Sequence, residues 1–134
     1  MPDEIEGRTC RRIPEIPLIS IVEDDESFRI WLKNLLTCVG FQPRGFSSAE
    51  AFLNSTDAGG TACLILDVCL PGMDGLELQC RIVSAKWQIP IIFVTAREDE
   101  AWRAQALSAG ALDFLYKPLE AESLLRAVDL ALKV

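Results

Sequence analysis

The sequence predicts an α/β protein built on a doubly wound, five-stranded parallel sheet. Five short runs rich in apolar and β-branched residues alternate with segments in which apolar residues recur at helical spacing. Three of these runs, 18–23, 62–67 and 90–95, are apolar almost throughout, which is typical of strands covered on both faces. Because the connections are short and strand alternates with helix, we expect parallel strands with helices on both sides.

The first predicted unit is the strand 18–23 followed by a long helix. The helix begins at Asp25 or Glu26, where an acid suits the positive end of the helix dipole. It runs through Cys38, and Gly40 ends the pattern. Its apolar side chains recur at helical spacing: Phe28, Trp31, Leu32, Leu35 and Leu36.

The second predicted unit is shorter. Its strand covers 41–46, and Ser47 with Glu50 three residues later resembles a capping box. We therefore expect a short helix with Ser47 as its N-cap, ending near Asn54. A turn at 57–60 leads to the next strand.

The rest of the chain repeats the same alternation. The remaining predicted elements are strands at 62–67, 90–95 and 112–116 and helices at 98–109 and 121–133. Asp74 is the predicted cap of a further helix, which carries Leu76, Leu78, Ile82 and Val83 at helical spacing. Gly110 is predicted to end the helix at 98–109.

Length and composition limit the possible functions. Half of the 134 residues are hydrophobic, which fits one domain over 18–134, whereas 1–17 is polar, contains three prolines and is expected to be a flexible extension. The net charge of −7 and the pI of about 4.6 argue against nucleic-acid binding by this domain. No apolar stretch reaches membrane-spanning length and no signal-peptide pattern is present, so we expect a cytoplasmic protein.

The lack of histidine in the sequence excludes triad catalysis and a phosphohistidine role, and it disfavours a structural zinc site. The five cysteines form no Cys-x-x-Cys pair. Cys38, Cys63 and Cys80 lie in helix or strand patterns, and we expect them to be small buried side chains in a reducing compartment.

Acidic residues end two of the apolar runs. Glu23, Asp24 and Asp25 follow the first strand, and Asp67 follows the third. In an open α/β sheet the carboxyl ends of the strands form the ligand-binding edge. Carboxylates gathered there repel one another unless a cation joins them, and oxygen ligands without histidine favour a hard ion such as Mg²⁺.

Five features at successive strand ends resemble the receiver domain of two-component response regulators, a CheY-like fold. They are Glu23-Asp24, Asp67, the loop Leu70-Pro71-Gly72-Met73-Asp74-Gly75, Thr95-Ala96 and Lys117-Pro118. The match covers about 18–134. Within the family, the segments 40–41, 48–53 and 110–114 are most similar to FixJ-type regulators. The resemblance implies a flavodoxin-like sheet with strand order 2-1-3-4-5.

The resemblance implies that Asp67 is the phosphoacceptor, forming an aspartyl phosphate. A carboxylate oxygen can attack a phosphoryl group in line, and the protein then contributes mostly positioning and charge neutralisation. Thr95 is expected to donate a hydrogen bond from its hydroxyl to a phosphoryl oxygen, and Lys117 to supply positive charge. The resemblance also implies a cis bond between Lys117 and Pro118, which directs the lysine ammonium into the site. From position alone these residues could also be a helix cap, a strand threonine and a surface lysine.

The resemblance also implies the ligands of Mg²⁺. Asp24 and Asp67 are expected to bind it directly, Glu23 through water, and Cys69 through its backbone carbonyl. Asp25 is a competing member of the acidic pair, although we expect it to cap the first helix instead.

Phe114 matches the switch aromatic of the family, while a plain core phenylalanine is the alternative. Phosphorylation is expected to draw Thr95 toward the phosphoryl group, let Phe114 rotate, and change the surface made by 98–109, 112–116 and 121–133. The implied partners are a sensor histidine kinase or phosphotransfer protein, and an output domain or downstream protein. No membrane or nucleic-acid partner is expected for this domain.

Three other functions fit parts of the pattern. A degenerate receiver would act as a constitutive binding module. A Mg²⁺-dependent phosphohydrolase would need a second acid two residues after the nucleophile, where Cys69 stands. A flavin carrier would need a phosphate loop after the first strand, where the acids would repel a phosphate. We therefore predict a signalling phosphoacceptor and not a turnover enzyme.

Overall fold

The computed structural model describes residues 16–133 and confirms the predicted sheet. Five parallel strands lie in the order β2-β1-β3-β4-β5. The strands are β1 (Leu18–Val22), β2 (Gln42–Phe46), β3 (Cys63–Leu66), β4 (Ile91–Thr95) and β5 (Asp113–Tyr116). The helices are α2 (Glu26–Cys38), α3 (Ala49–Leu53), α4 (Gly75–Ser84), α5 (Glu100–Ser108) and α6 (Ala121–Leu132), and a 3-10 turn spans Ala58–Gly60. Most of the predicted extension, 1–17, lies outside the described residues.

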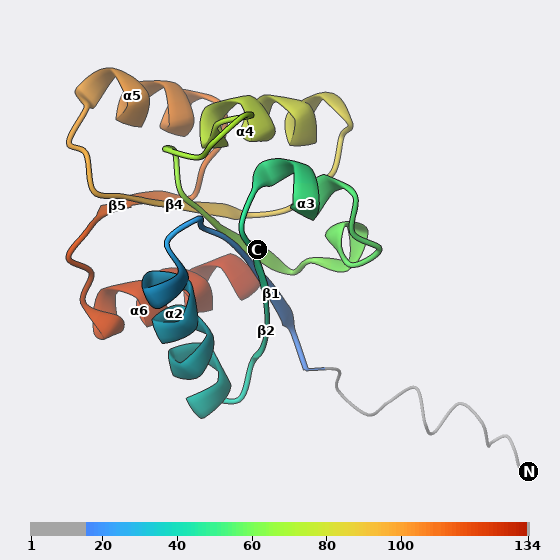
Figure 1. Ribbon diagram of the computed structural model, residues 1–134, viewed down its shortest axis with the longest axis vertical. Coiled ribbons are helices and arrows are strands. Elements are labelled where there is room, and N and C mark those ends of the chain that lie inside the picture. Colours follow the sequence, from blue (N-terminus) through green and yellow to red (C-terminus); the bar gives the residue numbers. More distant parts are fainter. Residues whose placement is uncertain (1–15, 134) are drawn as a thin grey trace, which may run out of the picture.

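The helices form a layer on each side of the sheet. Figure 1 shows α3, α4 and α5 on one side and α2 and α6 on the other. Alternate strand residues supply two separate cores, because successive side chains point to opposite faces. Phe93 and Leu64 belong to the core under α4, whereas Ile92 and Ile65 belong to the core under α2 and α6.

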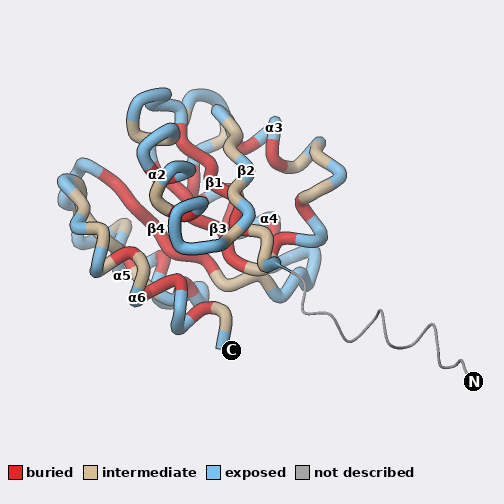
Figure 2. Tube along the Cα trace, turned by 90° about the horizontal axis from the view of Figure 1, so that it is seen from below, coloured by how far each residue is buried: buried red, intermediate tan, exposed pale blue. Residues whose placement is uncertain are grey.

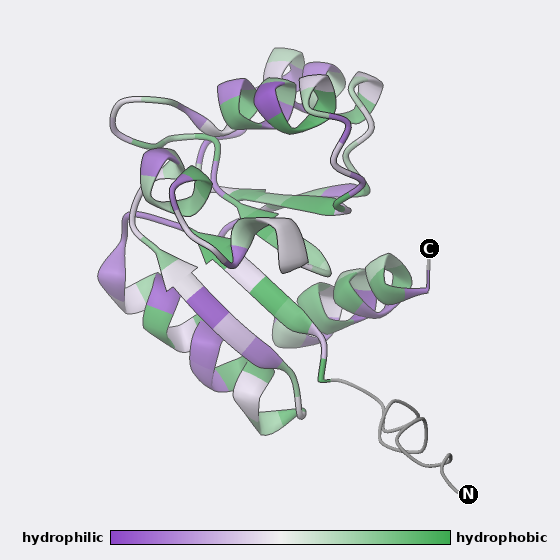
Figure 3. Cartoon of the chain, turned by 90° about the vertical axis from the view of Figure 1, so that its right-hand side faces the viewer, coloured by the Kyte–Doolittle hydropathy of each residue, from purple (hydrophilic) through white to green (hydrophobic). Residues whose placement is uncertain are grey.

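Burial in the molecule follows this layered arrangement. Buried residues concentrate in the strands, and the outer turns of the helices are exposed (Figure 2). The helices carry both hydrophilic and hydrophobic residues, as amphipathic helices on a sheet must (Figure 3). No helix within 16–133 combines the length and the apolar character that crossing a membrane requires.

Two predicted helix starts were wrong. Ser48 and not Ser47 caps α3, because Ser48 is extended and its hydroxyl accepts a hydrogen bond from the Ala51 amide at 3.0 Å. Helix α5 begins at Glu100, two residues later than predicted, because Asp99 caps it through the amides of Ala101 and Trp102. For α3 the cap is a neighbouring serine of equal capping ability, and for α5 it is an aspartate, a better N-cap than the arginine and glutamate that precede it.

Two predicted cysteine environments were also wrong. Cys63 is buried in β3, but Cys38 and Cys80 are exposed. Both exposed cysteines lie on the solvent side of their helices, α2 and α4. The apolar spacing of a helix defines its buried stripe, but a residue just outside that stripe is not fixed by the pattern.

Three helices end in the same motif with one informative difference. At the ends of α2 and α5, Gly40 and Gly110 adopt φ values of 98° and 105°, and the following amide bonds back to the helix. The end of α4 has the same hydrogen bonds, but the residue with positive φ, 62°, is Lys86. A side chain at such a position is strained, because its Cβ crowds the backbone.

We therefore expect Lys86→Gly to stabilise the protein. The gain should be about 1 kcal/mol in the free energy of unfolding, since glycine adopts this conformation without strain. Urea denaturation measures it, with Lys133→Gly at the exposed end of the chain as control. An unchanged or lower stability in Lys86→Gly would contradict the assignment.

Candidate functional site

The candidate site lies at the carboxyl edge of the sheet, at the ends of β1 and β3, where the chain leaves the sheet. Backbone hydrogen bonds extend the strand pairing by one residue and so fix the site residues. The Glu23 amide donates to the Phe46 carbonyl at 2.9 Å, and the Asp67 amide donates to the Val22 carbonyl at 3.1 Å. The ends of β1 and β3 form the crevice in which ligands of such sheets bind.

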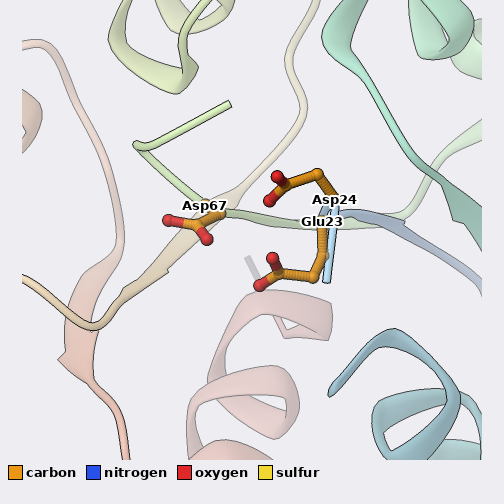
Figure 4. Close-up of side chains that lie close together, drawn as sticks. All are labelled: Glu23, Asp24 and Asp67. Atoms are coloured by element: carbon orange, nitrogen blue, oxygen red, sulfur yellow. The ribbon is translucent and has the colours of Figure 1, made fainter. Parts of the chain in front are cut away.

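Three carboxylates meet in this crevice. One side-chain oxygen from each of Glu23, Asp24 and Asp67 lies within 4.8 Å of the others, and Figure 4 shows the three side chains converging from two strand ends. Glu23 and Asp67 are buried, whereas Asp24 is exposed and leaves the cluster open to solvent. Asp25 caps α2 through the Phe28 amide at 3.2 Å, which supports the Glu23-Asp24 pairing.

Lys117 provides the positive charge of the site. Its backbone amide donates to the Thr95 carbonyl at 2.9 Å, and its bond to Pro118 is cis, as the resemblance implied. The ammonium Nζ lies 2.7 Å from Glu23 Oε1 and 3.3 Å from Asp67 Oδ2. The predicted meeting of residues far apart in the sequence is therefore confirmed.

The ionisation of the site reflects burial and pairing. Burial raises the pKa of Glu23 to about 7, although hydrogen bonds from Lys117 and from the Asp25 amide oppose the rise. Burial lowers the pKa of Lys117, but its contacts with Glu23 and Asp67 outweigh that effect and the net direction is upward. We interpret the group as a lysine cation with carboxylates that repel one another.

The raised pKa of Glu23 makes stability depend on pH in a definite direction. A carboxyl whose pKa rises from 4.5 to about 7 on folding favours the folded state below pH 4.5, and that stability is lost as the pH rises toward 7. Relative to Glu23→Gln, the wild type should lose on the order of 2 kcal/mol across this window. Denaturation at several pH values with a chelator present measures the difference, and parallel profiles would contradict it.

The predicted switch residues lie on one face of the sheet. Thr95 is fully buried at the end of β4, and its hydroxyl oxygen lies 3.5 Å from the Arg97 amide. Phe114 is buried in β5 with its ring centre 5.6 Å from that of Phe93. The register pairs Phe93 with Phe114 and Thr95 with Tyr116, so all four residues share one side of the two strands.

The loop after β3 holds the predicted backbone ligand next to Asp67. The Cys69 amide donates to Asp67 Oδ1 at 3.1 Å, while the cysteine side chain is exposed. The loop then closes through the Gly75 amide, which donates to the Val68 carbonyl at 2.9 Å. A Cβ at Gly75 would lie 2.2 Å from the Asp67 carbonyl oxygen, so no larger residue fits there.

Two contacts at the site were not foreseen. The Lys117 ammonium lies 4.3 Å from the centre of the Phe28 ring, a cation–π distance. Arg29 donates from Nη1 to the Glu23 carbonyl at 2.7 Å. Both residues stand in the first turn of the helix after the acidic pair. Their position directly after the acidic pair could have indicated contact with the site, but helical periodicity identified Phe28 only as part of the apolar pattern of the helix.

An acidic cluster joined to a single lysine, at the carboxyl edge of a 2-1-3-4-5 parallel sheet, defines the class of receiver domains. The comparison of sequences agrees, because a model of the family "Response regulator receiver domain" matches residues 19–129. The chain belongs to this family of two-component signalling phosphoacceptors.

Individual relatives place the chain more closely. It is 42% identical over 117 residues to "Response regulator protein TmoT" of Ectopseudomonas mendocina, covering 87% of this chain and 53% of that protein. The solved structure "FixJ-N" is 32% identical with a TM-score of 0.80, covering 90% of this chain and 96% of FixJ-N. "BeF3 Activated DrrB Receiver Domain" is 28% identical with a TM-score of 0.80, covering 90% and 100%. The chain thus spans about half the length of TmoT, and the predicted FixJ-like relationship is confirmed.

Proposed function

We propose that Asp67 accepts a phosphoryl group from a partner histidine kinase, a phosphotransfer protein or a small phosphodonor. The observation that carries this proposal is the Lys117 ammonium 3.3 Å from the Asp67 carboxylate, inside a crevice with Glu23 and Asp24. An Asp67 oxygen forms the new bond to phosphorus, and the bond from phosphorus to the donor atom breaks. The donor keeps that electron pair, so the transfer needs no oxidant or reductant.

The charge of the crevice gives Lys117 a defined task. Asp67 and the incoming phosphoryl group are both anionic, and their approach requires positive charge at the point of contact. The ammonium already touches two carboxylates, so it is held in place before the donor arrives. Thr95 would add a hydroxyl donor at the neighbouring strand end, and the Phe28 ring gives the ammonium a further, cation–π contact.

The same crevice fits Mg²⁺. Its side-chain donors are carboxylate oxygens only, which suits a hard cation. We propose that Asp24, Asp67 and the Cys69 carbonyl hold the ion and that Glu23 acts through water. When bound, Mg²⁺ would neutralise the oxygens of the transferring phosphoryl group. The amide of Cys69 already bonds to Asp67, which keeps this stretch of backbone beside the carboxylates.

We further propose that phosphorylation is read out on the surface made by α5, β5 and α6. Thr95 and Phe114 share one side of β4 and β5, and Tyr116, which pairs with Thr95, packs against the Phe114 ring, so a movement of Thr95 toward the site could reach Phe114. An output domain or a separate downstream protein would bind this surface. The four described cysteines are free thiols, which accords with a cytoplasmic location.

A metal titration tests the proposal. Mg²⁺ should change the tryptophan fluorescence of the wild type, and Asp24→Asn should weaken its apparent affinity at least about tenfold. Asp129→Asn, an acidic substitution on α6, serves as control. Equal affinity in Asp24→Asn and the wild type would contradict the ligand assignment. If the wild type bound no Mg²⁺, a constitutive binding module would become the better reading.

A further inference from the structure

A side chain from α3 reaches across to the loop that follows Asp67. The Glu50 carboxylate oxygen Oε2 accepts a hydrogen bond from the Met73 amide at 3.0 Å, although the two residues stand 23 positions apart. Glu50 lies in the first turn of α3, and Met73 lies just before the Asp74 cap of α4. The bond therefore joins two elements that do not share a strand pairing.

The space around this carboxylate is matched to the loop. Gly72 has a φ of 73°, and a Cβ built on it would lie only 2.6 Å from Glu50 Oε2. Glycine at this position thus permits both the left-handed turn and the close approach of Glu50. Two adjacent loop residues therefore contact the same carboxylate, Gly72 by close approach and Met73 by a hydrogen bond.

The capping geometry of α3 leaves Glu50 available for this contact. Because Ser48 is the N-cap, Glu50 is the second helical residue and not the third, which a capping box would need. The hydrogen bond from Met73 lowers the pKa of Glu50, and the charge of Arg81 on α4 acts in the same direction. Glu50 is therefore an anion beside the positive end of α4.

This loop carries both Asp67, the proposed phosphoacceptor, and Cys69, whose carbonyl is a proposed ligand of Mg²⁺. It begins at Asp67, passes the Cys69 backbone and ends at Gly75, whose amide closes it onto Val68. Backbone hydrogen bonds fix both ends, from the Asp67 amide to the Val22 carbonyl and from the Gly75 amide to the Val68 carbonyl. Within residues 16–133, Glu50 is the side chain that bonds to the middle of this loop, 70–73.

We propose that Glu50 is a positioning residue that fastens the loop and thereby keeps the Cys69 carbonyl beside the acidic cluster. The inference rests on the proposed role of that cluster in binding Mg²⁺. Without this contact the loop is freer to move. Cation binding must then order the loop, and the loss of conformational entropy weakens binding.

Three variants test this role. Glu50→Ala removes the acceptor, and Glu50→Gln keeps an acceptor oxygen without the charge. Glu122→Ala is the matched control, because Glu122 is also the second residue of its helix and is exposed. Two readouts are needed: amide hydrogen exchange at Met73 without metal, and the apparent dissociation constant for Mg²⁺.

In Glu50→Ala we expect exchange at Met73 to speed up by at least about tenfold and Mg²⁺ to bind about three- to tenfold more weakly. Glu50→Gln should recover most of both losses, and Glu122→Ala should match the wild type. Unchanged exchange and unchanged Mg²⁺ affinity in Glu50→Ala would overturn the proposal. So would an equal loss in Glu122→Ala, which would indicate a general effect of removing surface charge.

A double-mutant cycle with Gly72→Ala checks the contact itself. Gly72→Ala should lower the melting temperature less in the Glu50→Ala background than in the wild type, because the clash with the carboxylate is gone. Additive effects would overturn the contact. A wild type that binds Mg²⁺ but is never phosphorylated would defeat the proposed function and leave the Glu50 result intact.

Discussion

Asp67→Asn is expected to abolish covalent phosphorylation of this chain. Asparagine keeps the shape of the side chain and the acceptor for the Cys69 amide, but its amide group cannot form a stable acyl phosphate. Incubation with acetyl phosphate and Mg²⁺, followed by intact-mass measurement, should show a phosphorylated species for the wild type. The rate in Asp67→Asn should be at least about 100-fold lower, as expected when a nucleophile is removed.

A nearby aspartate supplies the matched control for this prediction. Asp74 is the N-cap of α4 and lies in the same loop as Asp67, and its carboxylate accepts from the Glu77 amide at 2.8 Å. Asparagine is an equally good N-cap, so Asp74→Asn should fold and be labelled like the wild type. Persistent labelling of Asp67→Asn would show that another residue is the acceptor.

Lys117→Met should have two separable effects. Phosphorylation should slow by about 100-fold, since one preorganised positive group at the reacting carboxylate is lost. The folded state should also lose about 2 kcal/mol near neutral pH, because Glu23 and Asp67 then lie buried together without a cation. Acetyl phosphate kinetics measure the first effect, and urea denaturation at a series of pH values measures the second.

The pH profile separates this account from a simple loss of packing. As the pH falls, Glu23 gains a proton and no longer repels the carboxylates of Asp24 and Asp67, so the stability deficit of Lys117→Met should shrink. Lys133→Met makes the same chemical change at an exposed position and should alter neither rate nor stability. A deficit in Lys117→Met that stays constant with pH would rule out carboxylate repulsion as its cause.

Much of the fold could be predicted because buried parallel strands have a simple signature. The runs that became β1, β3 and β4 are apolar because helices cover both faces, and each ends at or just before a polar residue of the crevice. The start of α3 could not be predicted from sequence, because Ser47 and Ser48 are chemically equivalent caps and only the backbone conformation decides between them. Cys38 and Cys80 are exposed because each lies just outside the buried stripe of its helix, and apolar periodicity does not define the edge of that stripe.

The site was predictable to the extent that strand ends define it. Glu23, Asp67 and Lys117 each follow a strand directly, so the parallel sheet brings them to one edge whatever the loops do. Contacts made by helices could not be predicted in this way. The approach of Phe28 to Lys117 and the reach of Glu50 to Met73 depend on how α2 and α3 pack, which local sequence does not specify.

One structure determination addresses the joint role of the acidic cluster and the lysine most directly. The protein would be crystallised with Mg²⁺ and beryllofluoride, which becomes tetrahedral when a carboxylate oxygen binds the beryllium and so stands in for an attached phosphoryl group. We expect the beryllium on an Asp67 oxygen, Lys117 Nζ on a fluorine, and the cation between Asp24, Asp67 and the Cys69 carbonyl. Beryllofluoride attached to another residue, or a cation bound away from Glu23, Asp24 and Asp67, would contradict the account.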